Sequence, residues 1–445
     1  MENVEHTGLG YPRSSDLRTP EGAAVPGSEG RWPSFAVVFS LGAAVITLNL
    51  VLSLSAHAPG RSLLARVGGP ALAITAAAGA VSVSRRAGRV SGGLLALLIG
   101  AVVTSVSVGD AGAHLVKVGL SGTSYTGLAS LLAGLTLLVL GTGLLLGAVR
   151  GWRRVFALPL AALLFFYLIA PLTVAVYATR VPVTPLSGRT PADMGLSYRD
   201  VTMTTRDGIA LSGWYLPSRN GAAVVVLHGS GSNRSNMLDH VAVLARHRYG
   251  VLAIDARGHG RSGGEAMDLG WFGALDVDAA VSFLERQPEV DAARIGALGL
   301  SMGGVEALTA AASDPRIRAV ISEGAGVGTF TDASSRGPAG WLSLPYFWVR
   351  HVAADLMSAA EAPIALKEAM ARIAPRPVLL ISGKGGAETD LNRRYQAVAP
   401  ASSELWELPD TSHSHAIWTH PEEWARRVLG FLDGALLPSS EETAG

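Results

Sequence analysis

The chain is long and apolar, and its charges nearly balance. It has 445 residues, of which 49% are hydrophobic and 16% charged, and 36 basic against 35 acidic side chains leave a formal net charge of +1. No basic run is interleaved with aromatic residues, which argues against a nucleic-acid partner. The absence of cysteine excludes disulfides, thiol catalysis and thiolate metal sites.

The amino-terminal part of the chain has the composition of a membrane anchor. Residues 1–33 are polar and contain Gly and Pro, which predicts a disordered tail and not a cleaved signal peptide. Within residues 34–180, five apolar stretches each approach the ~20 residues that a helix needs to span a bilayer. They are apolar all round, which favours a transmembrane bundle over a buried soluble one. The five stretches are residues 34–54, 64–83, 92–108, 127–149 and 155–178.

The short loops of this anchor predict its orientation. Three arginines lie between residues 85 and 89, and three more lie between residues 150 and 154. Because loops rich in Lys and Arg face the cytoplasm, five spans place the amino terminus inside and everything after residue 178 outside. We therefore expect a multi-pass protein of the plasma membrane with an extracytoplasmic carboxy-terminal domain. Transport is the alternative role for the spans, and anchoring is the interpretation that we adopt.

The carboxy-terminal part alternates between strand and helix patterns. A leading hairpin is predicted at residues 201–205 and 209–215, with Asp207-Gly208 as its turn. The alternation that follows predicts an α/β fold with a doubly wound, mostly parallel sheet, whose ligands bind at the carboxyl ends of the strands. The candidate strands are residues 223–227, 251–255, 295–298, 319–322, 378–381 and 405–408, and the candidate helices include residues 237–246 and 276–286.

A Gly-x-Ser-x-Gly motif follows the third of these strands. It reads Gly299-Leu300-Ser301-Met302-Gly303 and precedes a helix of small residues predicted at 305–312. A serine on such a strand-to-helix turn is held with its hydroxyl exposed, and the flanking glycines let strand and helix approach closely. The motif alone is weak in a chain with 53 glycines. Its position after a strand and before a helix makes Ser301 a candidate nucleophile.

Two glycine-rich loops support this interpretation. The first begins at His228, directly after a strand, and its backbone N–H groups can face the carbonyl oxygen of an acyl substrate. We predict the backbone amides of Ser230 and Met302 as the oxyanion donors and a structural role for His228. The second loop begins at Asp255, whose carboxylate is predicted to bond backbone donors, also in a structural role.

These motifs, in this order, resemble the α/β-hydrolase superfamily over residues 196–437. The resemblance is to bacterial serine hydrolases similar to the monoglyceride-lipase and serine-aminopeptidase branch. It implies a hydrolase domain over residues 196–438, with the chain order serine, acid, histidine. It also implies a serine hydrolase that cleaves an ester, or less readily an amide, through an acyl-enzyme on Ser301. The family's histidine matches His413 best, as the base, and His415 is a lesser alternative.

The acid is where the sequence departs from the family pattern. Gly386 stands at the usual aspartate position, and Glu388 and Asp390 are the nearest carboxylates. We prefer Glu388, because Asp390 is predicted to cap a helix at residues 391–397. Without an acid the histidine would be poorly oriented. A non-catalytic binding or sensing module on a membrane anchor is therefore the alternative to an enzyme.

A long segment between two strands, residues 326–373, predicts a short helical cap over the pocket. Its aromatic residues either line an acyl site or pack the cap onto the sheet. No spacing of His, Asp or Glu indicates a metal site, and no glycine-rich loop fits a nucleotide, so no cofactor is expected. The expected partners are a small-molecule or lipid-like ester and the bilayer.

Overall fold

The computed structural model describes the three later predicted spans and the α/β domain. The described residues are 90–109, 112, 115, 119–120, 122–148, 151–180, 186–264, 266–334, 338–383 and 385–438. The predicted disordered tail, residues 1–33, and the first two predicted spans, residues 34–54 and 64–83, lie outside them.

Three of the described helices are long and apolar enough to cross a membrane by length and composition: Val90–Gly109, Leu131–Ala148 and Arg154–Thr179. The second belongs to α3 (Gly122–Ala148). The third is part of a continuous helical run. This run consists of η1 (Gly151–Phe156), α4 (Ala157–Leu164), a single π-helical turn η2 (Phe165–Ile169) and α5 (Ala170–Arg180).

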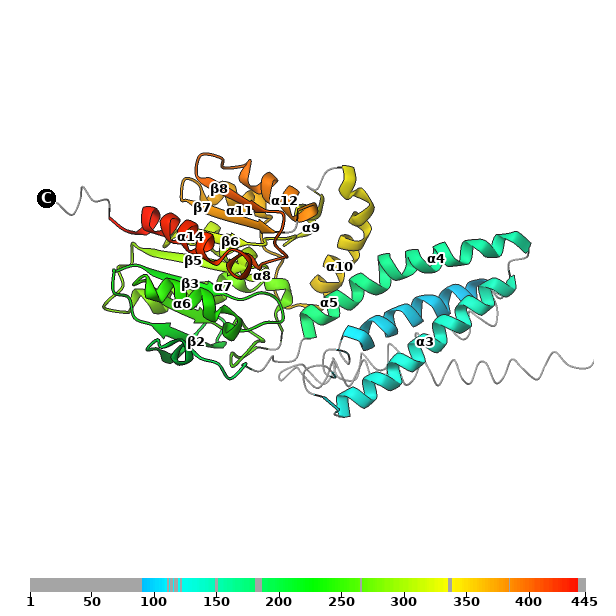
Figure 1. The fold of residues 1–445 in the computed structure, drawn as a ribbon. Coiled ribbons are helices and arrows are strands. Elements are labelled where there is room, and N and C mark those ends of the chain that lie inside the picture. The colour runs from blue at the N-terminus through cyan, green and yellow to red at the C-terminus, as the bar shows by residue number, and fades with distance from the viewer. Residues whose placement is uncertain are drawn as a thin grey trace, which may run out of the picture.

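Small residues bring these helices into close contact. A Cβ added at Gly134 would lie 2.9 Å from the backbone nitrogen of Thr104, so α3 approaches the backbone of the helix Val90–Gly109 closely. Five residues further along, where that helix ends, a Cβ on Gly109 would lie 2.9 Å from the carbonyl oxygen of Thr173. The chain therefore enters α4 at the end of the bundle remote from the sheet and leaves α5 at the end beside it (Figure 1).

The α/β domain is built on an eight-stranded sheet with the order β1-β2-β4-β3-β5-β6-β7-β8. The hairpin β1–β2 is antiparallel, as its predicted turn requires, and β2 also pairs antiparallel with β4. All other pairs are parallel. The strands are β1 (Arg199–Thr204), β2 (Ala210–Leu216), β3 (Ala223–Leu227), β4 (Gly250–Ile254), β5 (Ile295–Leu300), β6 (Ile317–Glu323), β7 (Val378–Gly383) and β8 (Ser403–Leu408).

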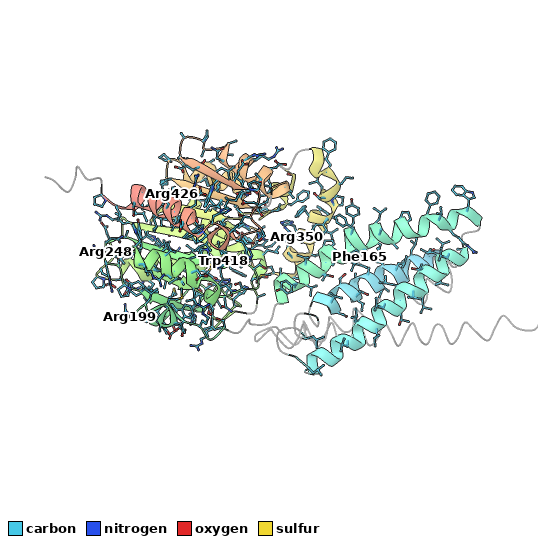
Figure 2. All side chains as sticks on the ribbon, in the orientation of Figure 1. Phe165, Arg199, Arg248, Arg350, Trp418 and Arg426 are labelled. Carbon is cyan, nitrogen blue, oxygen red and sulfur yellow. The ribbon has the colours of Figure 1, made fainter. Side chains whose placement is uncertain are left out.

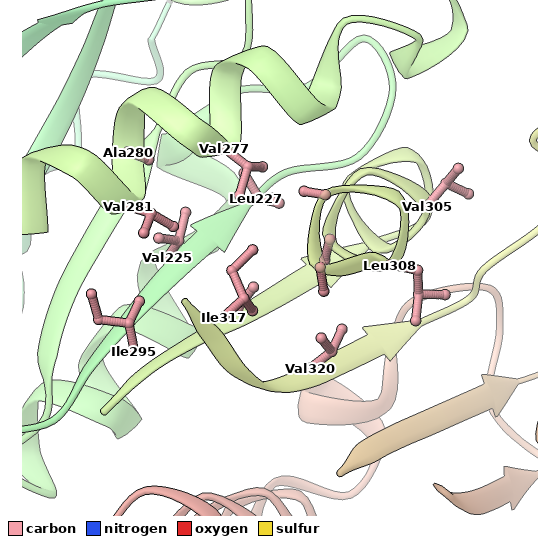
Figure 3. Close-up of a cluster of buried hydrophobic side chains, with 14 of the residues drawn as sticks. Val225, Leu227, Val277, Ala280, Val281, Ile295, Val305, Leu308, Ile317 and Val320 are labelled. Carbon is pink, nitrogen blue, oxygen red and sulfur yellow. The ribbon is translucent and has the colours of Figure 1, made fainter. Parts of the chain in front are cut away.

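Helices cover both faces of this sheet, which confirms the predicted doubly wound fold. Alternate residues of β3 point to opposite faces: Val225 belongs to one buried apolar cluster and Val224 to the other. Figure 3 shows the first cluster, in which Val277 and Leu308 pack against the strands. Its helices are α7 (Gly273–Glu285), α8 (Met302–Ser313), α11 (Leu366–Ile373) and α12 (Ala387–Gln396). The other face carries α6 (Leu238–Arg246), α13 (Ala416–Thr419) and α14 (Pro421–Leu436).

The predicted cap region forms helices between β6 and α11. They are α9 (Phe330–Ser334), η6 (Pro338–Ser343) and α10 (Leu344–Met357). Helix α10 packs against α5, between the sheet and the helical bundle (Figure 1). Ala353 and Ala354 of α10 form a buried cluster with Ala175 of α5 and Trp271. The cap therefore connects the hydrolase-like domain to the last apolar helix.

A fully buried histidine on α6 makes the stability of the domain sensitive to acid. The ring of His240 lies between Trp418 and Trp424, with ring centroids 5.5 and 5.1 Å away, and neither ring nitrogen has a hydrogen-bond partner among the described residues. Burial lowers its pKa from 6.5 to about 4. Between these pH values the unfolded chain binds more protons than the folded chain, so stability falls as the pH drops through this range.

We expect His240→Phe to flatten this pH dependence. The phenyl ring keeps the contacts with both tryptophans and removes a group that charges only in the unfolded chain. From pH 7.5 to pH 5 the wild type should lose about 2 kcal/mol more stability than the variant. Thermal unfolding of the full chain in detergent measures the difference. The exposed His247→Gln is the control and should keep the wild-type slope; equal slopes for all three proteins would contradict the prediction.

Candidate active site

Ser301 stands at a strained turn between β5 and α8. Its backbone has φ 54° and ψ −112°, a conformation that a non-glycine residue adopts at a cost. The flanking glycines permit the turn: a Cβ on Gly299 would lie 2.1 Å from the Gly303 carbonyl oxygen, and one on Gly303 would lie 2.6 Å from that of Leu227. The turn directs the serine side chain to the carboxyl ends of the parallel strands.

Substitution of the first of these glycines should therefore damage the fold. We expect Gly299→Ala to lower the free energy of unfolding by about 3 kcal/mol or to prevent folding, because a backbone carbonyl occupies the place of the new methyl group. In α14, Gly430 is exposed and nothing lies within 4 Å of an added Cβ. Gly430→Ala should thus leave stability unchanged or raise it by up to about 1 kcal/mol. Melting temperatures measure both; equal values would contradict this account.

His413 and Glu388 lie in line with the serine. The Nε2 atom of His413 is 2.8 Å from Ser301 Oγ, and its Nδ1 atom is 2.6 Å from Glu388 Oε2. His413 lies in the loop after β8, and Glu388 lies in the first turn of α12. The structure thus brings together the three residues that the sequence singled out. Such an arrangement can move a proton from a hydroxyl to an imidazole whose positive charge a carboxylate supports.

Backbone and hydroxyl donors hold the Glu388 carboxylate. Its Oε1 atom accepts hydrogen bonds from the Gly383 amide at 3.1 Å and from Ser382 Oγ at 3.4 Å. Both donors belong to the end of β7, so the sheet fixes the carboxylate. The other oxygen, Oε2, remains directed at His413. Glu388 can therefore orient the imidazole in one tautomer, with the proton on Nδ1.

The predicted helix cap at Asp390 is wrong. Helix α12 begins at Ala387, after Gly386 with φ 67°, so Asp390 lies inside the helix in its first turn. The positive φ angles of Gly385 and Gly386 let the chain turn into the helix earlier than the sequence pattern indicated. Asp390 points to solvent and pairs with Arg393 at 3.4 Å. The reason given for preferring Glu388 thus fails, while the geometry places Glu388 beside His413.

The two other histidines of these loops point elsewhere. Nδ1 of His415 lies 2.6 Å from the carbonyl oxygen of His413. His228 is buried; its Nδ1 donates to the Gly229 carbonyl at 2.8 Å, and its Nε2 accepts from the Ala256 amide at 3.1 Å. Burial lowers the pKa of His228 to about 4, so the ring stays neutral near neutral pH. Nδ1 thus fixes the ring within its own loop, and Nε2 joins this loop to the loop after β4.

Asp255 also joins loops. Its carboxylate is fully buried and pairs with the buried guanidinium of Arg234 at 2.8 Å. It also accepts hydrogen bonds from the amides of Arg234 and Arg261, at 2.8 and 2.9 Å. These contacts fix the loop after β4 beside the segment that follows the His228 loop.

The two predicted oxyanion donors flank the serine. A Cβ on Gly229 would lie 3.5 Å from Ser301 Cβ, which places the loop of Ser230 next to the nucleophile. Met302 is the first residue of α8, where amides have no partner within the helix. Neither the Ser230 nor the Met302 amide donates a hydrogen bond to any residue that the structure describes. Both are available to a substrate oxygen.

A buried glutamate that the sequence analysis missed holds the segments of the site together by hydrogen bonds. Glu323 ends β6, and its carbonyl oxygen accepts the Ser301 amide at 2.7 Å. Its carboxylate accepts the Ala416 amide at 2.8 Å and Trp424 Nε1 at 3.2 Å. Burial raises the pKa of this carboxyl group above its usual range. Glu323 thus connects the nucleophile turn to the chain just after His413. In the sequence, the signal that could have indicated this role was a charged residue at the end of an apolar strand.

The end of α5 lies against the residue next to the nucleophile. Met302 packs in one buried cluster with Ala178 of α5 and Met267, and Tyr177 borders the same cluster. Met267 Sδ also accepts a hydrogen bond from Ser230 Oγ at 3.0 Å. The candidate site therefore sits at the face of the domain where the last apolar helix arrives. In the described part of the chain, no group of three or more His, Asp or Glu side chains could hold a metal ion.

Comparison with known proteins identifies the family. A family model described as "Serine aminopeptidase, S33" matches residues 218–373. The protein Rv2307c of Mycobacterium tuberculosis is 30% identical over 223 residues, which cover 48% of this chain and 72% of that protein. The chain belongs to the S33-like branch of the α/β hydrolases. Its hydrolase domain thus carries the fold that its motifs predicted.

Two further similarities extend over most of the compared proteins. The protein YfhR of Escherichia coli O157:H7 is 25% identical over 257 residues, covering 55% of this chain and 84% of YfhR. Among solved structures, the Pyrococcus furiosus esterase Pf2001 has 30% sequence identity and a TM-score of 0.47, and the match covers 58% of this chain and 99% of the esterase.

Proposed function

We propose that this hydrolase cleaves an ester, and less readily an amide, through an acyl-enzyme on Ser301. The observation that carries the proposal is the unbroken line of contacts from Ser301 Oγ to His413, at 2.8 Å, and from His413 to Glu388, at 2.6 Å. These distances lie within the reach that nucleophile activation by a general base needs. They favour an enzyme over the alternative of a non-catalytic module.

The proposed reaction has two halves. His413 Nε2 takes the proton of Ser301 Oγ as this oxygen attacks the substrate carbonyl, and the Ser230 and Met302 amides stabilise the negative oxygen of the tetrahedral intermediate. His413 then gives its proton to the leaving alcohol or amine. In the second half His413 activates a water, which hydrolyses the acyl-enzyme and regenerates the Ser301 hydroxyl. Glu388 stabilises the imidazolium each time.

Two substrate classes test the proposal directly. Detergent-solubilised protein should hydrolyse 4-nitrophenyl butyrate, with a much lower rate on an amino-acid 4-nitroanilide. A fluorophosphonate probe should label Ser301 irreversibly. If the protein hydrolysed only the anilide, the proposed substrate would be an amide and not an ester. A wild type that neither reacts with the probe nor turns over the ester would overturn the proposal in favour of a binding module.

We propose also that the apolar helices anchor this domain on the outer side of the plasma membrane, with the amino terminus in the cytoplasm. Arg153 and Arg154 lie in η1, at the junction of α3 and α4, and the sheet lies at the opposite end of the bundle (Figure 1). In this cysteine-free chain, a membrane-impermeant maleimide applied to intact cells should label Arg426→Cys in exposed α14 and not Arg154→Cys. The reverse pattern would place the domain in the cytoplasm.

A further inference from the structure

Part of the cap lies alongside the last apolar helix. The Tyr167 hydroxyl donates a hydrogen bond to the carbonyl oxygen of Leu342 in η6 at 2.7 Å. The rings of Phe166 and Tyr346 have centroids 5.6 Å apart. Figure 2 labels Phe165 on the helical bundle and Arg350 on the neighbouring α10. The amino-terminal end of α10 is thus held at the level of residues 166–167.

Residues 166–167 lie well inside the apolar helix that would span the bilayer. The neighbouring helix Val90–Gly109 ends beside Thr173, because a Cβ on Gly109 would lie 2.9 Å from the Thr173 carbonyl oxygen. Tyr167 precedes Thr173 by six residues, which is about 9 Å of helix. Hydrocarbon about 30 Å thick needs about 20 residues of helix, so a bilayer matched to Val90–Gly109 includes Tyr167 and whatever packs on it.

The outer surface of η6 and α10 has the chemistry of that environment. The exposed fractions of Leu342, Trp348 and Leu356 are 79%, 55% and 81%, and Trp341 and Val352 are exposed with them. Positions 345, 348, 352 and 356 recur at helical spacing and form one stripe. Large exposed apolar residues gathered in one place mark an interaction surface, and tryptophan is typical of the membrane interface.

Neither charged side chain of η6 and α10, Arg350 or Asp355, lies on the amino-terminal part of the apolar stripe. Arg350 turns inward, where it donates to the Val327 carbonyl oxygen at 3.3 Å and lies over the Phe347 ring at 4.8 Å. Asp355 lies near the carboxyl end of α10, at the level of Ala354, which packs with Ala175 in the last turns of α5. The exposed side chains of the amino-terminal half of the segment are therefore all apolar or aromatic.

We propose that η6 and the first turns of α10 are embedded in the bilayer and contact the acyl chains of lipids. The occupant is lipid and not a second protein, because the apolar stripe continues the surface of a helix that itself spans the bilayer. The proposal rests on the anchor proposed above and is independent of the ester substrate. An embedded cap would hold the domain with Ser301 close to the membrane, since Met302 packs on the end of α5.

Single cysteines in this cysteine-free chain test the proposal. Leu342→Cys and Trp348→Cys would carry an environment-sensitive fluorophore in proteoliposomes, with Val139→Cys on α3 as the bilayer reference, 72% exposed. Val398→Cys, 38% exposed and just after α12 in the α/β domain, is the matched apolar control in water. We expect nitroxide-labelled lipid to quench the two cap labels as strongly as Val139, and iodide to quench Val398 several-fold more than either cap label.

Each other pattern overturns the proposal in a distinct way. If lipid quenches Val139 and iodide quenches the cap labels, the anchor stands and the cap lies in water. Cap labels protected from both quenchers would indicate a contact with a second copy of the chain. If iodide also reaches Val139, the proposed anchor itself fails. Melting temperatures equal to that of the cysteine-free protein confirm that each variant is folded.

Discussion

Ser301→Ala should abolish both fluorophosphonate labelling and ester turnover while leaving the fold intact. Loss of the nucleophile in a serine hydrolase removes on the order of 10⁶-fold in kcat, because no neighbouring group can form the acyl-enzyme. The hydroxyl contributes little to packing, and alanine keeps the same Cβ at the strained turn. The melting temperature should therefore stay within a few degrees of the wild type. Burst kinetics with 4-nitrophenyl butyrate measure the acylation step directly.

The matched control lies on the helix that this serine precedes. Ser313 ends α8, and its hydroxyl bonds carbonyl oxygens of the same helix, with Ala310 at 3.1 Å. Ser313→Ala should keep full labelling and turnover. If Ser301→Ala is still labelled, another serine is the nucleophile and the proposed chemistry is wrong. If both variants lose activity with a lowered melting temperature, the effect is structural.

The fold of the hydrolase domain was predictable because its signals are local and strong. Buried parallel strands appear as continuous apolar runs, and the predicted strand at residues 223–227 coincides with β3. The loops after those strands carry the site, so their residues could be proposed in chain order. Ser301 was proposed in this way and His413 from the family resemblance, and in the structure His413 Nε2 lies 2.8 Å from Ser301 Oγ.

Features that depend on contacts distant in sequence could not be predicted. The predicted strand ended at residue 322, and the Glu323 carboxylate contacts Ala416 and Trp424, which lie 93 and 101 residues further along the chain. The packing of α10 on α5 joins segments whose sequences give no sign of each other. The start of α12 was misplaced because Gly385 and Gly386 adopt positive φ angles, which the sequence allows without requiring.

The identity of the acid is decided by comparing two carboxylates on one helical turn. Glu388→Gln should lower kcat by about 10⁴-fold, because a neutral amide does not stabilise the imidazolium and its NH2 group can donate to Nδ1, which favours the wrong tautomer of His413. Asp390→Asn should change kcat by less than about twofold, since Asp390 pairs with Arg393 on the exposed side of α12. Each substitution removes one negative charge and keeps the side-chain shape. A difference between the two variants therefore reflects where the carboxylate lies and not the loss of charge alone.

The dependence of kcat/KM on pH gives a second test of Glu388. If Glu388 had only a structural role, its substitution would leave the pH profile unchanged. In the wild type the carboxylate 2.6 Å from Nδ1 supports the positive charge of the imidazolium, so the acidic limb of kcat/KM, where the general base becomes protonated, depends on that charge. Glu388→Gln should shift this limb to lower pH, whereas Asp390→Asn should leave it in place. A large loss with Asp390→Asn and an unshifted limb with Glu388→Gln would transfer the role to Asp390, which would then have to turn toward His413 during the reaction.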